Sequence, residues 1–510
     1  MKIRLLAVLS FLMVPITPAI AATCDSLSSL TLPDTTITLA QTSTVAQVSD
    51  LRNRADASPF KNLPAFCRVA ATLKPTSDSD IKIEVWLPVS GWNGKFQAVG
   101  NGGWAGVISY SAMAQALEHG YATTSTDTGH VGATGSFALG HPEKLTDFGY
   151  RAVHEMTVKA KAIVAAFYGG PPKISYWNGC STGGRQGLKE AQRFPDDYDA
   201  IIAGASANPR THLAFATLWI AQAAHKDEAS YIPPAKYPAI HQAVLNACDA
   251  LDGLKDGLIT DPTRCHFDPQ VLSCKDAEGP TCLTAPQIET VRKILSPAKN
   301  PQTGEEIFPA LEPGSELGWA ALAGPQPFQA TVDHFRYVVF KDPNWDWKTL
   351  NFTSDVALAD KIDNETINAT DPNLKPFLAH HGKLLLYHGF SDQNVPPQAT
   401  INYYKRVVDT LSGAGLRPAD SIRLFMVPGM GHCGGGEGPN TFDMMSALDQ
   451  WKEQGRAPVR IVASHRIAGK VDRTRPLCPY PQVAKYQGTG SIDDEANFAC
   501  ELPSSAATND

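Results

Sequence analysis

The chain has 510 residues, of which 43% are apolar and 19% are charged, the composition of an ordinary globular protein. That length is enough for one large domain with a sizeable insertion, or for two domains. The formal net charge of -7 argues against nucleic acid as a partner.

Residues 1–22 have the pattern of a cleaved secretory signal. Lys2 and Arg4 precede an apolar run over 5–14, and small residues suited to cleavage follow it. Two prolines interrupt the run well short of a membrane-spanning length, which argues against an anchor. We therefore expect a secreted or periplasmic protein with no membrane partner, and the sequence leaves open which of the two destinations applies.

The chain up to about residue 205 alternates strand-like with helix-like segments. Residues 81–88 show the period of two that is typical of a half-buried strand. Residues 150–168 have the pattern of a helix that ends at Gly-Gly-Pro. The elements expected here are strands at 81–88, 96–100, 174–177 and 200–204 and helices at 150–168 and 187–193.

Periodicity resumes late in the chain. Residues 383–388 form a continuous apolar strand, which is typical of a parallel sheet buried on both faces. A helix is expected at 401–411, a strand at 422–427 and a helix at 442–454. This alternation on both sides of the middle segment predicts a mostly parallel α/β sheet, the core of an α/β-hydrolase.

The segment between these two parts has a different composition. It carries four cysteines, many prolines and four of the nine tryptophans. We interpret it as a large inserted lid domain over the carboxyl edge of the sheet. The expected organisation is a signal peptide at 1–22, the first part of the core at 23–204, the lid at 205–380 and the second part of the core at 381–510.

Ser181 lies in a sequence typical of a catalytic nucleophile. Residues 179–183 read Gly-Cys-Ser-Thr-Gly and fit the G-x-S-x-G elbow of α/β-hydrolases. The motif occurs often by chance, and the alternative is an ordinary turn serine. Here a predicted strand precedes it and a predicted helix follows, which favours the nucleophile.

A base and an acid are expected later in the chain. His432 lies in a glycine-rich loop after a predicted strand, whereas His388, at a strand end, is expected to be structural. Asp392 follows the buried strand at 383–388 and lies between Ser181 and His432, the chain order of an α/β-hydrolase triad. The alternative for Asp392 is a solvated turn aspartate.

The oxyanion of an acyl-transfer reaction needs two N–H donors. Thr182, the residue after the nucleophile, is expected to supply one. The second is expected from the early loop Asn101-Gly102-Gly103, with Gly103 preferred over Gly102. The alternative for this loop is a tight turn without a catalytic role.

Ten cysteines in an exported chain are compatible with five disulfides. The sequence does not determine connectivity, but proximity along the chain favours four local pairs and leaves Cys180 and Cys433 as partners. Such a bridge would hold the turn of Ser181 against the loop of His432. The four local pairs are Cys24–Cys67, Cys248–Cys265, Cys274–Cys282 and Cys478–Cys500.

An aspartate-rich loop lies between Cys248 and Cys265. Asp249, Asp252 and Asp256 alternate with glycines, and such carboxylates are suitable ligands for a hard cation such as Ca²⁺. The acidic spacing is not that of an EF-hand. Read alone, the loop is also compatible with a series of Asp-Gly turns.

The sequences GCSTGG, GHC and CDALDGLKDG together resemble the tannase/feruloyl esterase family, which includes enzymes that hydrolyse mono(2-hydroxyethyl) terephthalate. The resemblance extends from about Cys24 to Cys500. It implies a triad of Ser181, Asp392 and His432 and a Cys180–Cys433 bridge. It also implies a structural Ca²⁺ in the lid, remote from bond breaking. The implied ligands are the carboxylates of Asp249, Asp252 and Asp256 and the carbonyls of Leu254 and Leu258.

By this resemblance the expected function is hydrolysis of aromatic acid esters of the feruloyl or galloyl type, free or attached to a plant polymer. Terephthalate half-ester hydrolysis, a serine carboxypeptidase and a non-catalytic binding protein on a hydrolase scaffold are the alternatives. Candidate lid residues for a flat ring are Trp319, Phe335, Tyr337 and Phe340, with Arg336 for a carboxylate or phenolic group, although core packing and surface exposure are their ordinary roles. The oligomeric state stays open.

Overall fold

The computed structural model describes residues 22–44, 60 and 63–503. The signal peptide predicted at the start of the chain lies almost entirely outside these ranges. Within them, none of the helices combines the length and the hydrophobicity needed to cross a bilayer.

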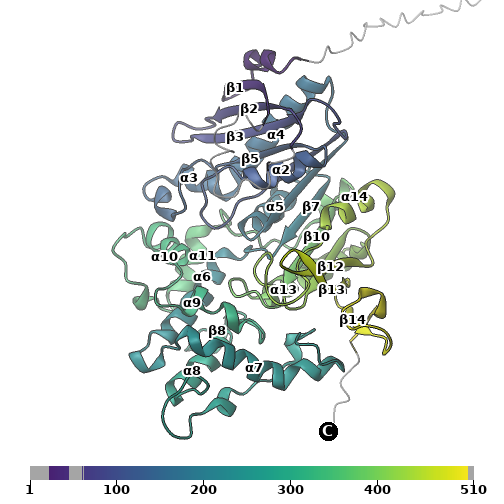
Figure 1. The fold of residues 1–510 in the computed structure, drawn as a ribbon. Coiled ribbons are helices and arrows are strands. Elements are labelled where there is room, and N and C mark those ends of the chain that lie inside the picture. Colours follow the sequence, from purple (N-terminus) through teal and green to yellow (C-terminus); the bar gives the residue numbers. More distant parts are fainter. Residues whose placement is uncertain (1–21, 45–59, 61–62, 504–510) are drawn as a thin grey trace, which may run out of the picture.

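A nine-stranded mixed sheet forms the centre of the molecule (Figure 1), and its strands follow the order β1-β2-β3-β5-β4-β6-β7-β10-β11. Pairing is antiparallel from β1 to β5 and parallel from β5 to β11. This arrangement confirms the predicted α/β-hydrolase core. The strands are β1 Thr35–Ser43, β2 Phe66–Leu73, β3 Ile81–Pro88, β4 Lys95–Val99, β5 Ala122–Thr126, β6 Ile174–Cys180, β7 Ala200–Gly204, β10 Lys383–Gly389 and β11 Ile422–Val427.

Strand β5 was not expected because its sequence, Ala-Thr-Thr-Ser-Thr, is polar. All five residues are nevertheless buried in the middle of the sheet. Three of the four hydroxyl groups bond to backbone groups. For example, Thr124 donates to the carbonyl of Glu84 at 2.7 Å, and Ser125 accepts from the N–H of Ser109 at 2.9 Å, whereas the Thr123 hydroxyl has no partner among the described residues. Hydrogen bonding of this kind removes the penalty for burying polar groups.

Helices pack on both faces of the sheet. Met156 of α4, Leu188 of α5 and Ile401 of α13 belong to one buried cluster with the strands. Ala116 of α2 and Leu448 of α14 belong to a second cluster. The helices flanking the sheet are α2 Tyr110–Glu118, α3 Pro142–Thr146, α4 Ala152–Tyr168, α5 Thr182–Arg193, α12 Lys375–Ala379, α13 Pro397–Gly413 and α14 Met444–Gln454.

Most of the chain between β7 and β10, from α6 to α11, forms a mainly helical region at the end of the molecule opposite β1 in Figure 1. It has its own apolar clusters, one around Phe215 and Phe335 and another around Ile240 and Trp319. We refer to this region as the lid. Its elements are α6 Arg210–Ala224, α7 Tyr237–Cys248, α8 Ala285–Ile294, β8 Ala298–Lys299, β9 Glu306–Phe308, α9 Ala320–Ala323, α10 Gln329–Asp333 and α11 Asp355–Asp363.

Two small antiparallel hairpins follow α14 near the C-terminus. The first pairs β12 (Ile461–Ile467) with β13 (Lys470–Leu477), and the second pairs β14 (Val483–Tyr486) with β15 (Phe498–Glu501). Arg475 of β13 reaches the lid, where it forms an ion pair with Asp256.

Candidate active site

Ser181 lies on a sharp turn between β6 and α5, at the carboxyl edge of the parallel strands. Its backbone has φ 61° and ψ -121°, a conformation that is costly for a residue with a side chain. The flanking glycines are required by close packing, since a Cβ atom on Gly179 would lie 2.5 Å from the backbone of Gly183. The structure therefore gives residues 179–183 the strained strand–turn–helix geometry of a nucleophile elbow.

Asp392 and His432 meet above the same edge of the sheet. Asp392 follows β10, His432 follows β11, and Oδ2 of Asp392 lies 2.7 Å from Nδ1 of His432. The aspartate is fully buried, whereas the histidine side chain is 16% exposed. The acid thus orients the imidazole from inside the protein, and the ring reaches the surface of a cavity.

The carboxylate of Asp392 is held by four hydrogen-bond partners. Oδ1 accepts from the backbone N–H groups of Asn394 and Val395 at 2.8 and 2.9 Å. Oδ2 contacts His388 at 3.0 Å as well as His432. Burial alone would raise the pKa of Asp392, but the hydrogen bonds from His388 and His432 hold that pKa well below its usual value. Asp392 is therefore an anion at neutral pH.

His388 is a member of this network that the sequence did not single out. Its Nδ1 lies 2.7 Å from Oγ1 of Thr400, and its Nε2 lies 3.0 Å from both Asp392 Oδ2 and the carbonyl of Val395. Two acceptors at Nε2 assign the proton to that nitrogen. The only sequence signal is that His388 lies near the end of β10, four residues before Asp392, which does not distinguish it from a core histidine.

Ser181 and His432 line one cavity of about 350 Å³. Helix α6 of the lid contributes Arg210, Leu213 and Thr217 to its wall. A volume of this size lies within the range of small-molecule sites, about 300–1,000 Å³. The serine, the histidine and a lid surface therefore enclose a space suitable for a small substrate.

The aromatic residues considered from the sequence do not line this cavity. Trp319 and Phe335 are fully buried in the lid clusters, and Nε of Arg336 donates to the carbonyl of Trp345 at 3.0 Å. Phe328, before α10, is the aromatic residue of the cavity wall.

A disulfide joins the Ser181 turn to the His432 loop. Cys180 and Cys433 are bonded with Cα atoms 6.0 Å apart, across 253 residues of sequence. The bridge connects the last residue of β6 with the loop after β11, and two other strands separate β6 from β11 in the sheet. The structure also contains the four predicted local bridges, Cys24–Cys67, Cys248–Cys265, Cys274–Cys282 and Cys478–Cys500.

The two expected oxyanion donors lie next to Ser181. Gly103 lines the cavity together with Gly102, and its backbone has φ 53°. Thr182 is the first residue of α5, and its hydroxyl donates to the carbonyl of Gly103 at 3.0 Å. This bond ties the loop after β4 to the nucleophile turn.

The aspartate-rich loop of the lid packs against the C-terminal part of the core. Both oxygens of Asp249 accept backbone N–H bonds from within the loop, at 3.1 to 3.2 Å. Asp252 accepts from the Thr260 hydroxyl at 2.6 Å, and Asp256 pairs with Arg475 at 2.6 Å. Four of the five expected calcium ligands border one small cavity, namely Asp252, Leu254, Asp256 and Leu258.

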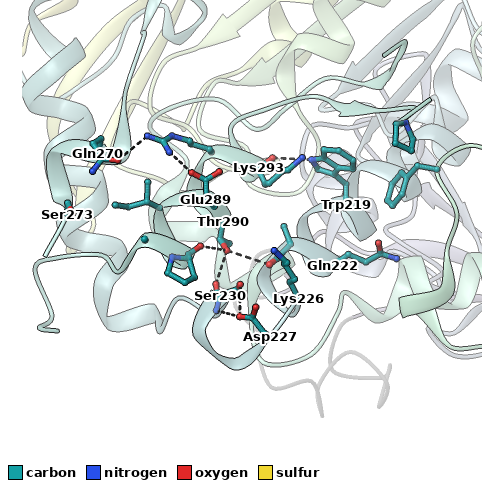
Figure 2. Close-up of a pocket in the computed structure, with 17 residues that line it drawn as sticks. Trp219, Gln222, Lys226, Asp227, Ser230, Gln270, Ser273, Glu289, Thr290 and Lys293 are labelled. Carbon is teal, nitrogen blue, oxygen red and sulfur yellow. Dashed lines mark hydrogen bonds and ion pairs between the residues drawn. The ribbon is translucent and has the colours of Figure 1, made fainter. Parts of the chain in front are cut away.

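A larger cavity, of about 760 Å³, lies elsewhere in the lid between α6 and α8 (Figure 2). The ammonium group of Lys293 covers the ring of Trp219 at 4.4 Å. Ser230 donates from its hydroxyl and from its backbone N–H to Oδ1 of Asp227, at 2.8 and 2.9 Å. The described lining residues include no histidine, so this cavity lacks the base that a serine nucleophile needs.

Comparisons with known proteins agree with this geometry. The family model for tannase and feruloyl esterase matches residues 67–501. An uncharacterized esterase of Xanthomonas campestris pv. campestris is 40% identical, with 95% of this chain and 92% of that protein covered. A probable feruloyl esterase B-1 of Aspergillus oryzae is 35% identical, with 87% of this chain and 85% of that protein covered.

Solved structures show the same relationship. The crystal structure of feruloyl esterase B from Aspergillus oryzae superposes with a TM-score of 0.86 at 32% identity, covering 94% of this chain and 99% of that one. Tannin acyl hydrolase from Aspergillus niger, at 22% identity and a TM-score of 0.77, covers 92% of both chains and shares the fold. The chain therefore belongs to the tannase and feruloyl esterase family of ester hydrolases.

Proposed function

We propose that this protein hydrolyses esters of aromatic carboxylic acids outside the cytosol, through an acyl-enzyme on Ser181. The observation that carries the proposal is the convergence of three chain segments on one cavity. Ser181 on its strained turn and His432 on its loop both line the cavity, and the buried Asp392 orients the histidine through its Nδ1. A serine, a histidine and a buried carboxylate in this order form the catalytic unit of serine hydrolases.

In the proposed reaction, His432 acts first as a base and then as an acid. Its Nδ1 is engaged by Asp392, so Nε2 is the nitrogen that takes the proton as Ser181 Oγ attacks the ester carbonyl. The same proton passes to the leaving alcohol as the C–O bond breaks. Water then attacks the acyl-enzyme with His432 again as the base, releasing the acid and restoring Ser181.

The negative charge that develops on the carbonyl oxygen would be stabilised by backbone N–H groups of Thr182 and Gly103. Support comes from their position, since Gly103 borders the cavity beside Ser181 and the hydroxyl of Thr182 ties the two segments together at 3.0 Å. Donors held in place before the reaction need no reorganisation when the charge appears.

The cavity wall favours a flat acyl group with a polar end. Leu213, Ala214 and Phe328 supply apolar surface, and Arg210 supplies a cation. Burial lowers the pKa of Arg210 to about 10, so its guanidinium stays charged at neutral pH. A phenolic ring is suited to this wall, and the similarity to feruloyl esterase B of Aspergillus supports a feruloyl-type ester.

Arg210 also supports a second candidate substrate. A terephthalate half-ester carries a carboxylate opposite the scissile ester, and a guanidinium in the wall is a suitable partner for a carboxylate. We rank this substrate second, since Arg210 is already placed over the Trp104 ring at 4.8 Å and its carboxylate-binding geometry is therefore restricted.

Export is part of the proposal. Five disulfides are characteristic of proteins that fold outside the reducing cytosol. The predicted signal at 1–22 agrees with this location.

A structural Ca²⁺ in the lid is the second part of the proposal. Carboxylates of Asp249, Asp252 and Asp256 and carbonyls of Leu254 and Leu258 would hold it. The common cavity beside four of these residues supports the site, whereas the ion pair of Asp256 with Arg475 shows that one carboxylate already has a cationic partner. Bound there, the ion would neutralise the cluster and hold the lid loop against β13.

The decisive experiment is a substrate panel with the purified protein. Methyl ferulate, methyl gallate, mono(2-hydroxyethyl) terephthalate, p-nitrophenyl acetate and a blocked dipeptide would be compared by kcat/KM, and a fluorophosphonate probe would label the nucleophile. We expect the aromatic esters to be preferred and Ser181 to carry the label. Preference for the dipeptide would identify a peptidase, and no labelling together with no turnover would identify a binding protein.

A further inference from the structure

We propose that His154, Glu190 and Asp197 form a binding site for a divalent transition-metal ion in the core. The site is independent of the ester chemistry. It joins α4, which carries His154, to α5, which carries Glu190, and to the loop that follows α5, which carries Asp197. One atom from each side chain lies within 4.8 Å of the others.

The environment of the Glu190 carboxylate indicates a bound ligand. The residue is 1% exposed, and both of its carboxylate oxygens lack a hydrogen-bond donor among the described residues. Its carboxyl group faces that of Asp197, and two carboxyl groups in contact repel each other unless a proton or a cation lies between them. A buried carboxylate without a partner is costly, so something must neutralise this pair.

The lysines around the cluster leave these oxygens without a donor. Nζ of Lys161 donates to the backbone carbonyl of Asp197, and Nζ of Lys189 donates to the carbonyls of Glu365 and Asn368. Neither lysine therefore contacts the Glu190 oxygens, which have no cationic partner among the described residues.

His154 determines which kind of ion the site suits. Its ring stacks on Phe194 at 3.9 Å, and Nδ1 lies 2.7 Å from Oδ2 of Asp197. An imidazole nitrogen with two carboxylates favours Zn²⁺ and similar first-row ions over Ca²⁺ or Mg²⁺, which prefer oxygen ligands alone. Three protein ligands leave one position of a tetrahedral ion for water.

Binding requires the three side chains to move closer together. Atoms that share one tetrahedral Zn²⁺ at about 2.1 Å lie about 3.4 Å apart, so atoms that now lie up to 4.8 Å apart must approach each other by as much as about 1.4 Å. The ion would replace the hydrogen bond between His154 and Asp197, and the Nδ1 proton would leave to solvent or move to Nε2. The His154 side chain is 29% exposed, which provides a path for the ion.

The expected role is structural. Glu190 lies nine residues after Ser181 on the same helix, about 13 Å along its axis at about 1.5 Å per residue, too far to contact substrate. An ion there would tie the far end of the nucleophile helix to α4. Loss of the ion is expected to lower thermal stability and to leave substrate preference unchanged.

The test uses the full exported chain, stripped with EDTA and then saturated with Ca²⁺ so that the lid loop is occupied. Co²⁺ is titrated and its visible d–d absorption recorded, and melting temperature is followed with added Zn²⁺. The variants are Glu190→Gln, which keeps the shape of the side chain, and His154→Gln at a partly exposed position. Asp196→Asn is the matched control, because this exposed neighbour pairs with His380 outside the cluster.

We expect one Co²⁺ per wild-type chain and a melting temperature that rises with Zn²⁺, with both responses retained in Asp196→Asn. Affinity should fall at least tenfold in Glu190→Gln and His154→Gln. If Glu190→Gln does not fold, the Co²⁺ affinity of His154→Gln alone tests the site. Absence of Co²⁺ absorption in the wild type, or equal absorption in the folded variants, would overturn the site. A wild type whose melting temperature does not respond to Zn²⁺, together with a Glu190→Gln variant of equal stability, would also overturn the site. That result would show that Glu190 and Asp197 share a proton.

Discussion

His388 donates from Nε2 to Oδ2 of Asp392 at 3.0 Å, the same oxygen that His432 contacts. One carboxylate oxygen thus has a buried histidine on one side and the cavity histidine on the other. We regard His388 as a positioning residue, because it acts on the reaction only through Asp392.

We expect His388→Leu to lower kcat about tenfold or more with little change in KM, because Asp392 loses one donor and its orientation becomes less defined. Stability should fall by about 1–3 kcal/mol, the cost of leaving a buried group without its partner. Thr400→Val, which removes the contact at the other nitrogen of His388, should show a smaller effect of the same kind. A His388→Leu enzyme with unchanged kcat in its folded range would contradict this role.

Ser181→Ala should reduce turnover of the best ester by about ten-thousandfold or more, because the covalent step is lost. The fold should be unaffected, since a methyl group fits the turn. Circular dichroism and the melting temperature check the fold, and Ser273→Ala, in the other lid cavity, is the matched control. Substantial turnover by a correctly folded Ser181→Ala protein would move the nucleophile elsewhere.

The double variant Cys180→Ala, Cys433→Ala tests whether the bridge positions the catalytic groups. A displacement of about 1 Å can cost on the order of a hundredfold in rate, so activity should fall severely at temperatures where the protein is still folded. The chain-entropy model sets an upper limit of about 5 kcal/mol on the loss of stability. The pair Cys274→Ala, Cys282→Ala, which closes a short lid loop, should leave kcat nearly unchanged; equal losses of kcat in both double variants would count against a positioning role.

Calcium should stabilise the protein increasingly as its concentration is raised. The free energy of unfolding is expected to rise as RT ln(1 + [L]/Kd), so the melting temperature should climb with added Ca²⁺ and fall with EDTA. Asp252→Asn should weaken this response, whereas Asp276→Asn, on the exposed lid surface, should retain it. A melting temperature that changes with neither Ca²⁺ nor EDTA would contradict the proposed Ca²⁺ site.

The raised pKa of His241 predicts a loss of stability at alkaline pH. This lid residue contacts Glu316 at 2.8 Å and Glu437, in the loop after His432, at 2.7 Å. Burial opposes its charge, but the two glutamates raise the pKa of His241 to about 9. Because the folded pKa exceeds the unfolded value of about 6.5, the stabilisation is complete below pH 6.5 and is lost as the pH rises to about 9.

Denaturant unfolding at pH 6, 7.5 and 9 would measure this effect. The wild type should lose stability across the series, and His241→Gln should show a flatter profile with lower stability at pH 6. Glu437→Gln should show an intermediate profile, since it removes one of the two acidic partners. Parallel profiles for wild type and His241→Gln would show that this contact does not link the lid to the loop of His432.

The sequence by itself determined the elements whose signal is local. The elbow at Ser181, the apolar strand before Asp392 and the late glycine-rich loop of His432 each have a pattern that backbone geometry requires at that point of the chain. Parallel strands place their carboxyl ends at one edge, so these three residues were expected to meet, and the elbow and the Asp392–His432 contact are in place.

Other features of the fold and of the site depend on tertiary structure. Strand β5 is polar and nevertheless buried, and backbone groups brought close by the fold bond to three of its four hydroxyl groups; no periodicity in the local sequence predicts this. Arg210 reaches the cavity only because α6 of the lid returns over the sheet. The contact of His388 with Asp392 and the approach of Glu190 to Asp197 depend on how loops and helices pack. Such contacts join residues whose sequence context is that of an ordinary core, so only the folded chain reveals them.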